Sequence, residues 1–147
     1  LILSHTGMSA FYAAWRALAG LQAARGRTVW IQLGWLYLDT TALLRKFAAA
    51  PADFAFLGDV HDLAAVERLL TEQAGRVAGI VTETPTNPLV QTPDVPALAA
   101  LARKHGARVI LDPTFVSPFN VNVLDHADVV VNSLTKYSAS EGDLIAG

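Results

Sequence analysis

The sequence predicts an α/β fold in three layers, with a mostly parallel sheet covered by helices on both faces. Two observations support this prediction. Segments with helical and strand-like patterns alternate along the chain, as they do where crossover helices join parallel strands. Hydrophobic residues make up 52% of the 147 residues and charged residues only 16%, which suits strands that are buried on both faces.

Four segments have the composition and flanking residues of helices. The expected ranges are residues 8 to about 24, 40–50, 62 to about 73 and 94–105. The first is rich in Ala and other good helix formers. We expect Asp39 or Thr40 to cap the second helix and His61-Asp62 to cap the third. Glycines follow the first, third and fourth segments, and Pro51 follows the second, as stop signals.

Five shorter segments, rich in apolar and β-branched residues, are expected to form the strands. Their ranges are 28–32, 54–57, 79–83, 108–112 and 128–132. In open parallel sheets, ligands bind beyond the carboxyl ends of the strands. The residues that follow the last three strands are therefore the main candidates for a ligand site, namely 83–88, 112–115 and 132–136.

Composition argues against several classes of partner and site. The net charge is −2 and no basic run occurs, so neither a nucleic acid nor an anionic membrane is an expected partner. The absence of cysteine excludes disulfides and thiolate metal sites, and the four scattered histidines lack ligand spacing, so we assign no metal. No apolar run is long enough to span a membrane. There is no dinucleotide-binding glycine motif and no P-loop.

The polar residues near the expected strand ends match the needs of one ligand. Ser133 and Thr135 provide hydroxyls that point the same way in an extended segment, while the Lys136 amine points the other way. Asp112 ends an apolar strand, where a buried carboxylate needs a partner. Gly7-Met8 opens a helix, whose free N–H groups can bind an anion. Pyridoxal 5′-phosphate (PLP) would use its phosphate, pyridine nitrogen and aldehyde to engage all of them.

Three motifs in this order resemble the PLP-dependent enzymes of Cys/Met metabolism, the group of cystathionine γ-synthase, cystathionine lyase and methionine γ-lyase. The motifs are Glu83-Thr84-Pro85-Thr86-Asn87-Pro88-Leu89, Asp112-Pro113-Thr114-Phe115 and Ser133-Leu134-Thr135-Lys136-Tyr137. The resemblance covers the whole chain. It implies the large domain of the aspartate-aminotransferase-like fold (fold type I), with residues 1–147 as its central portion, and we expect both ends to be cuts through a larger protein.

The resemblance also implies a role for each site residue. Lys136 would form the Schiff base with PLP, and Asp112 would pair with the pyridine nitrogen. The phosphate would be held by the Gly7 and Met8 backbone together with Ser133 and Thr135. The remaining cofactor contacts would come from Asn87 to the phenolic oxygen, Thr114 and Tyr37 on the two ring faces, and Glu83 in support. Lys136, Asp112 and Tyr37 are the expected catalytic residues.

Several residues depart from the family pattern. Leu38 and Asp39 stand where the family has two glycines after the tyrosine, so the turn after Tyr37 is expected to differ, with Trp35 as a possible substitute for that tyrosine. Pro113 stands where asparagine is usual, and His5-Thr6 where small serines are usual. These departures bear on the type of reaction more than on cofactor binding.

The function implied by the resemblance is β/γ-elimination or γ-replacement on cysteine, cystathionine, methionine or activated homoserine, by a cytoplasmic homo-oligomer with shared active sites. The substrate amine would displace Lys136, and the freed lysine would remove the α-proton while Asp112 keeps the ring cationic. In the family, a neighbouring subunit supplies a tyrosine and an arginine, and a later domain supplies the arginine for the substrate carboxylate. The alternatives are a non-catalytic or incomplete PLP-fold scaffold and an aminotransferase on the same fold.

Overall fold

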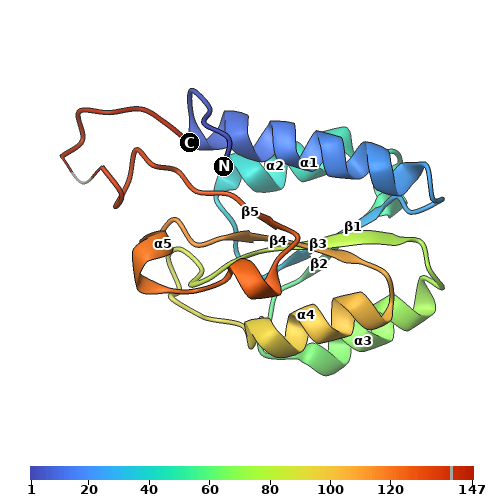
Figure 1. The fold of residues 1–147 in the computed structure, drawn as a ribbon. Coiled ribbons are helices and arrows are strands. Elements are labelled where there is room, and N and C mark those ends of the chain that lie inside the picture. Colours follow the sequence, from blue (N-terminus) through green and yellow to red (C-terminus); the bar gives the residue numbers. More distant parts are fainter. Residues whose placement is uncertain (140) are drawn as a thin grey trace.

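A five-stranded parallel sheet forms the middle layer of the computed structural model, which describes residues 1–139 and 141–147 (Figure 1). The strand order is β2-β1-β3-β4-β5, and each neighbouring pair runs parallel. The strands are β1 (Val29–Leu33), β2 (Phe54–Leu57), β3 (Val77–Glu83), β4 (Arg108–Asp112) and β5 (Val129–Val130). The order reverses between β1 and β3, which is where α/β sheets open a crevice for ligands.

Helices cover both faces of the sheet. The pair α1 (Gly7–Ala23) and α2 (Leu38–Phe47) lies on one face, and the pair α3 (Leu63–Glu72) and α4 (Val95–Lys104) lies on the other (Figure 1). Each pair encloses its own apolar cluster against the sheet. All residues of β1 and β3 are buried, as expected for central strands covered on both sides. The predicted fold class is therefore confirmed.

Close packing under α1 depends on a glycine in the central strand. Trp15 of α1 and Trp30 of β1 are both buried, with ring centroids 5.8 Å apart. A Cβ on Gly79 in the adjacent strand would come within 2.6 Å of the Trp30 ring. Gly79 therefore leaves the space that the Trp30 ring occupies, and this packing holds α1 against the sheet.

Several boundaries differ from the predicted ones. The second helix begins at Leu38 and ends at Phe47, so neither Asp39 nor Thr40 caps it; Tyr37 is its N-cap residue and makes no side-chain capping bond. The last strand is shorter than predicted. Three short elements were not predicted, namely the 3-10 turns η1 (Pro51–Asp53) and η2 (Leu124–His126) and the one-turn helix α5 (Ser117–Asn120). By contrast, Asp62 caps α3 as predicted, accepting a bond from the Ala65 N–H.

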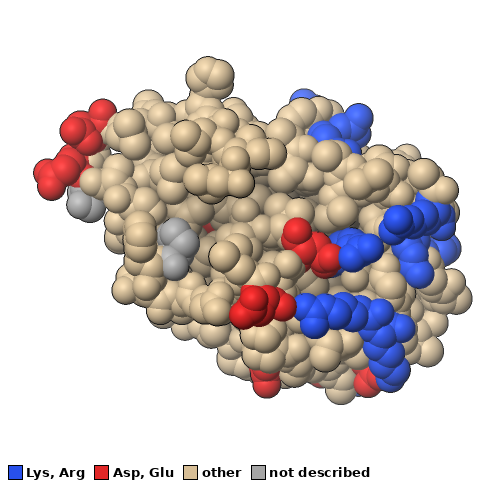
Figure 2. Space-filling view, in the orientation of Figure 1, with Lys and Arg blue, Asp and Glu red and all other residues tan. Residues whose placement is uncertain are grey.

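Charged side chains are distributed unevenly over the molecule. On the face shown in Figure 2, Lys and Arg gather toward one end, at the right, which Figure 1 identifies as the end where the strands begin. The opposite half of that face, where the strands end, has few charges and is largely covered by uncharged residues (Figure 2). Among the described residues, no helix has both the length and the apolar composition to cross a membrane.

Candidate active site

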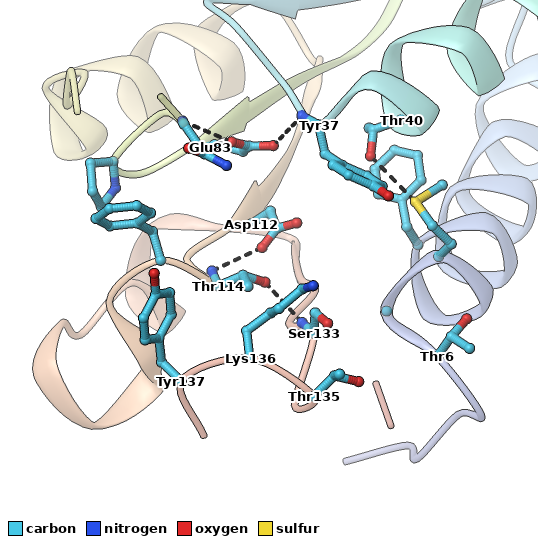
Figure 3. Close-up of a pocket in the computed structure, with 16 residues that line it drawn as sticks. Thr6, Tyr37, Thr40, Glu83, Asp112, Thr114, Ser133, Thr135, Lys136 and Tyr137 are labelled. Carbon is cyan, nitrogen blue, oxygen red and sulfur yellow. Dashed lines mark hydrogen bonds between the residues drawn. The ribbon is translucent and has the colours of Figure 1, made fainter. Parts of the chain in front are cut away.

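A cavity of about 600 Å³ opens at the carboxyl ends of the strands. All ten residues predicted to bind the cofactor line it (Figure 3). They are Gly7, Met8, Tyr37, Glu83, Asn87, Asp112, Thr114, Ser133, Thr135 and Lys136. These residues come from the start of α1, the start of α2 and the segments at the ends of β3, β4 and β5. The volume lies within the usual range for small-molecule sites.

The start of α1 forms one wall of the cavity. Thr6 is the N-cap, and its hydroxyl accepts a hydrogen bond of 3.0 Å from the Ser9 N–H. The N–H groups of Gly7 and Met8, in the first turn, have no acceptor within the helix. A Cβ on Gly7 would lie 2.7 Å from the Ser133 Cβ and 3.1 Å from its Oγ. The absence of a side chain at Gly7 thus brings a hydroxyl and two free N–H groups together, a donor set suited to a phosphate.

Two acidic residues end neighbouring strands in register. Glu83 of β3 is paired with Asp112 of β4. The pKa of Glu83 is raised to about 7, chiefly by burial and also by the nearby Asp112 carboxyl, while hydrogen bonds from the Tyr37 and Asn87 N–H groups oppose the rise. Burial also raises the pKa of Asp112, although hydrogen bonds from Thr114 oppose this. Within the part of the chain that the structure describes, neither carboxyl has a cationic partner in an ion pair.

Thr114 connects two of the cavity-lining segments. Its N–H donates to the Asp112 carboxylate at 2.9 Å, and its hydroxyl accepts from the Ser133 N–H at 2.8 Å (Figure 3). The orientation of Asp112 is therefore fixed by the turn that follows β4. The same turn holds the segment after β5, which carries Lys136, close to the end of β4.

The segment that carries Lys136 is not extended, contrary to the prediction. Residues 134–139 form turns, and the Lys136 N–H donates to the Ser133 carbonyl at 3.1 Å. The alternation of side chains expected for a strand therefore does not apply here. Figure 3 nevertheless shows Lys136 pointing into the cavity, on the side where Asp112 and Ser133 lie.

Thr135 makes contacts that the sequence did not suggest. Its hydroxyl donates to the Ala146 carbonyl at 3.2 Å and accepts from the Ala146 N–H at 3.0 Å. Donation to a phosphate would require this hydroxyl to leave the Ala146 carbonyl, because a hydroxyl has one proton. The next residue, Gly147, packs against α1: a Cβ there would lie 2.4 Å from the Thr6 carbonyl oxygen.

Of the two aromatic candidates, Tyr37 lines the cavity and Trp35 is absent from its lining. Tyr37 is half exposed, and its N–H donates to Glu83. Helix α2 begins directly after Tyr37, at Leu38. The two residues that replace the family glycines therefore form the first turn of a helix, and Tyr37 keeps its place in the wall.

Six further residues line the cavity, none of which was predicted as a site residue. They are Thr6, Phe11, Thr40, Pro85, Phe115 and Tyr137. Phe115 and Tyr137 each follow a predicted site residue, and their rings lie 5.6 Å apart. Adjacency to Thr114 and Lys136 was the available signal for this pair. Phe11 and Thr40 lie one helical turn beyond Met8 and Tyr37, so only the helix positions could have indicated them.

The donor set of the site suits an organic anion more than a metal. Among the described residues, no group of three or more His, Cys, Asp or Glu side chains could hold a metal ion. Lys136 is the single cationic side chain among the described residues that line the cavity. An amine, a buried carboxylate and a helix start therefore share one cavity, which is the combination that PLP requires.

Comparison with known proteins decides the family. Residues 2–147 match the model of the Cys/Met metabolism PLP-dependent enzymes. The chain belongs to this family. Members of the family depend on PLP, so the predicted family and cofactor are both confirmed.

Relatives in this family carry out several named activities. The chain is 44% identical over 145 residues to an L-2-amino-4-chloropent-4-enoate dechlorinase/desaturase from Streptantibioticus cattleyicolor, with 99% of this chain covered. It is 36% identical over 143 residues to a cystathionine gamma-synthase from Neurospora crassa, with 96% of this chain covered. The matches span 29% and 23% of the two relatives' own lengths, so this chain corresponds to less than a third of each.

Solved structures of the family have the same fold. A cystathionine gamma-lyase from Lactobacillus plantarum, complexed with L-serine, superposes with a TM-score of 0.80 at 30% identity, covering 99% of this chain and 36% of that one. An O-acetylhomoserine (thiol)-lyase described as putative, from Campylobacter jejuni, superposes with a TM-score of 0.78 at 24% identity, covering 99% and 34%. That second structure contains N′-pyridoxyl-lysine-5′-monophosphate.

Proposed function

We propose that the full protein containing this chain is a PLP-dependent enzyme of sulfur amino-acid metabolism. Its reaction would be β/γ-elimination or γ-replacement on cysteine, cystathionine, methionine or activated homoserine. One observation supports this above all others: residues from five separate segments, chosen from sequence motifs, line a single cavity. Residues 1–147 would be the central portion of the cofactor domain.

The residues present fit PLP. Asp112 has no cationic partner among the described residues, and a protonated pyridine nitrogen would supply one. The start of α1, with Ser133 against Gly7, leaves a cradle that a Cβ would fill, and this cradle suits the phosphate. The Lys136 amine in the same cavity suits the aldehyde. We therefore assign these groups to the nitrogen, the phosphate and the aldehyde.

The remaining residues would orient the cofactor ring. Asn87 would donate to the phenolic oxygen, while Thr114 and Tyr37 would lie against the two faces of the ring. Thr135 would donate to the phosphate once its hydroxyl leaves the Ala146 carbonyl, while the Ala146 N–H continues to donate to it. Glu83 would support the wall between Tyr37 and Asn87.

In the proposed reaction, Lys136 and Asp112 do the chemical work. When bound, PLP supplies an electron sink that stabilises negative charge at the substrate α-carbon. The Lys136 amine would anchor the cofactor, would take the α-proton of the substrate as a general base, and would return a proton to the product as a general acid. The buried Asp112 carboxylate would pair with the ring nitrogen and would favour its protonated, cationic form.

Relatives support chemistry at the γ-carbon. The name of the Streptantibioticus relative places a chlorine on carbon 4, which is the γ-carbon, and cystathionine gamma-synthase is named for the same position. Both names thus point to the same carbon of the substrate. We propose that the first substrate panel contains γ-substituted amino acids with both sulfur and halogen leaving groups.

The active unit would be a homo-oligomer with shared active sites, working in the cytoplasm, where amino acids and PLP are available. Lys136 alone provides positive charge among the described cavity residues, yet a phosphate and a substrate carboxylate both need cationic partners. We propose that these partners come from a second subunit and from other segments of the full protein. Size-exclusion chromatography with light scattering tests the oligomeric state, and cell fractionation tests the location.

The decisive experiment uses full-length protein purified with PLP. Its visible absorbance is recorded, the protein is reduced with borohydride, and the modified peptide is mapped by mass spectrometry. A pyridoxyl adduct on Lys136, absent from Lys136→Ala, is the expected result. No visible band and no adduct would contradict the proposal and favour a scaffold without chemistry.

Product analysis separates the reaction classes. Elimination releases a keto acid and ammonia, whereas an aminotransferase leaves the cofactor in its pyridoxamine form. Incubation of the enzyme with each amino acid, followed by assays for ammonia and for the spectrum of the cofactor, distinguishes the two. A pyridoxamine spectrum without ammonia would establish the aminotransferase alternative.

A further inference from the structure

Glu83 occupies a position that links two walls of the cavity. It is the last residue of β3, lies in register with Asp112 and lines the cavity. Only 7% of its surface is exposed. A carboxylate this deeply buried requires hydrogen-bond donors, and the identity of those donors indicates what Glu83 does.

The two oxygens of Glu83 accept from two different segments. Oε1 accepts from the Tyr37 N–H at 2.5 Å, and Oε2 accepts from the Asn87 N–H at 3.2 Å (Figure 3). Tyr37 immediately precedes α2, and Asn87 lies in the turn after β3. Both donors are backbone groups of residues whose side chains line the cavity.

The start of α2 depends on this contact. Tyr37 is its N-cap residue and provides no side-chain capping bond. The Glu83 carboxylate lies at the helix start, where a negative charge interacts favourably with the helix dipole. Glu83, from a strand distant in sequence, thus accepts a hydrogen bond from an N–H group at the helix start, as a capping side chain would.

We propose that Glu83 is a positioning residue whose carboxylate holds Tyr37 and Asn87 at a fixed separation across the cavity. This inference rests on the proposed function, in which those two residues contact the cofactor. It goes further by naming the group that sets their spacing and by requiring that group to have two acceptor oxygens and no donor.

The requirement for two acceptors follows from the pair of donors. An ionised carboxylate accepts on both oxygens, whereas an amide or a protonated carboxyl group places a donor against one of the N–H groups. The other titratable groups that line the same cavity are the Asp112 carboxyl, the Tyr37 and Tyr137 phenols and the Lys136 amine. Burial raises the pKa of Glu83 to about 7, so its two-acceptor form is gained as pH rises through neutrality.

The test compares three full-length variants with the wild type. Glu83→Gln keeps the size of the side chain but loses one acceptor, and Glu83→Asp keeps both oxygens but shortens the reach. Glu72→Gln is the matched control, because Glu72 is exposed at the end of α3. For each protein, the PLP dissociation constant and absorbance spectrum are measured at pH 8. The melting temperature of the PLP-free protein is measured under the same conditions.

We expect Glu83→Gln to weaken PLP binding by about tenfold or more, the effect of losing a hydrogen bond to a charged group. Its visible band should shift, because Tyr37 and Asn87 move relative to the ring. The melting temperature should not fall in proportion, since the amide removes a buried charge. Glu83→Asp should also bind PLP more weakly, and Glu72→Gln should match the wild type.

Hydrogen exchange measured by mass spectrometry gives a readout that does not depend on PLP. In Glu83→Gln, amide exchange should accelerate in peptides that contain Tyr37 or Asn87, while peptides from α3 stay unchanged. Wild-type affinity, spectrum and exchange in Glu83→Gln would overturn the inference. So would a loss of affinity that merely follows a general loss of stability.

The failure of this inference differs from the failure of the proposed function. If the wild type shows no PLP adduct on Lys136, both the proposed function and the positioning role of Glu83 are wrong. If the wild type binds PLP and both Glu83 variants bind it equally well, the function holds and the positioning role is wrong.

Discussion

The two ends of the central sheet use charged side chains differently. At the end where the strands begin, charges are paired: Arg76 bonds Asp53 at 2.6 Å, and Arg108 bonds Asp128 at 2.7 Å. At the end where the strands finish, Glu83, Asp112 and Lys136 line a cavity and form no ion pair among the described residues.

The difference shows at which end of the sheet the charged side chains find their partners within the described residues. Paired charges satisfy one another and serve the fold, whereas the carboxyl groups in the cavity carry an unfavourable desolvation energy that their hydrogen bonds offset only in part and that a cationic ligand group would offset further. Burial raises the pKa of both Glu83 and Asp112, which is the expected sign of that cost. The following experiments test this contrast, beginning with the largest expected effect.

Removal of Asp112 should produce the largest effect. Asp112→Ala is expected to lower kcat/KM of the full-length enzyme by several orders of magnitude, because the ring nitrogen loses its only proposed acidic partner. The measurement is steady-state kinetics with saturating PLP. A loss below about tenfold, equivalent to 1.4 kcal/mol, would count against the assigned role.

The pH dependence of stability is the second test. The pKa of Glu83 is raised from 4.5 to about 7 in the folded protein, so the folded state binds more protons than the unfolded state between these values. The contribution of Glu83 to the free energy of unfolding is therefore fully present below about pH 4.5 and is lost as pH rises through about 7. This contribution to the free energy of unfolding is at most roughly 3 kcal/mol.

Urea unfolding of the PLP-free protein at pH 5, 6, 7 and 8 measures this dependence. Glu83→Gln should flatten the curve in this range, because the amide does not titrate. Identical curves for the wild type and Glu83→Gln would show that Glu83 does not carry the desolvation energy that we assign to it. Asp112 contributes in the same direction, since burial raises its pKa as well.

A pair of glycine substitutions in α1 forms the third test. Gly7→Ala should lower the free energy of unfolding by about 2 kcal/mol, because its Cβ would lie 2.7 Å from the Ser133 Cβ. It should also weaken PLP binding. Gly20→Ala in the same helix meets no atom within 4 Å and should be stabilising by about 0.5–1 kcal/mol. Chemical unfolding and PLP titration of both variants give the comparison, and equal behaviour would contradict the close packing at Gly7.

The smallest effect is expected among the paired charges far from the cavity. Lys104 bonds Glu67 at 2.6 Å, and both side chains are largely exposed. Lys104→Gln should leave PLP binding unchanged and should move the melting temperature only slightly, because exposed pairs contribute little. A clear loss of PLP affinity in this variant would contradict the view that the paired charges away from the cavity play no part in cofactor binding.

Much of this architecture could be predicted because it depends on local patterns. The bounds of β2 and β4 agree with the predicted ones, and Asp62 is the N-cap of α3 as predicted, while Asp94, predicted as the first residue of its helix, is the N-cap of α4. The ten site residues could be grouped because parallel strands bring their carboxyl ends to one edge. Their individual roles stay predictions, which the experiments above test.

The failures occur where tertiary contacts override local preference. Helix α2 begins before Asp39, at a point where Glu83, distant in sequence, accepts a hydrogen bond from the Tyr37 N–H. The segment with Lys136 adopts turns instead of an extended form, since Thr114 and Ala146 hold it. No window of neighbouring residues contains that information.

The three tryptophans differ in exposure in a way that makes the protein its own optical probe. Trp15 and Trp30 are buried, whereas Trp35 is 49% exposed and lies two residues before Tyr37. Their fluorescence should therefore separate into a blue-shifted component from the interior and a red-shifted component near the cavity wall. Selective quenching of the red component by iodide, before and after a ligand is added, would follow changes at the wall without any attached dye.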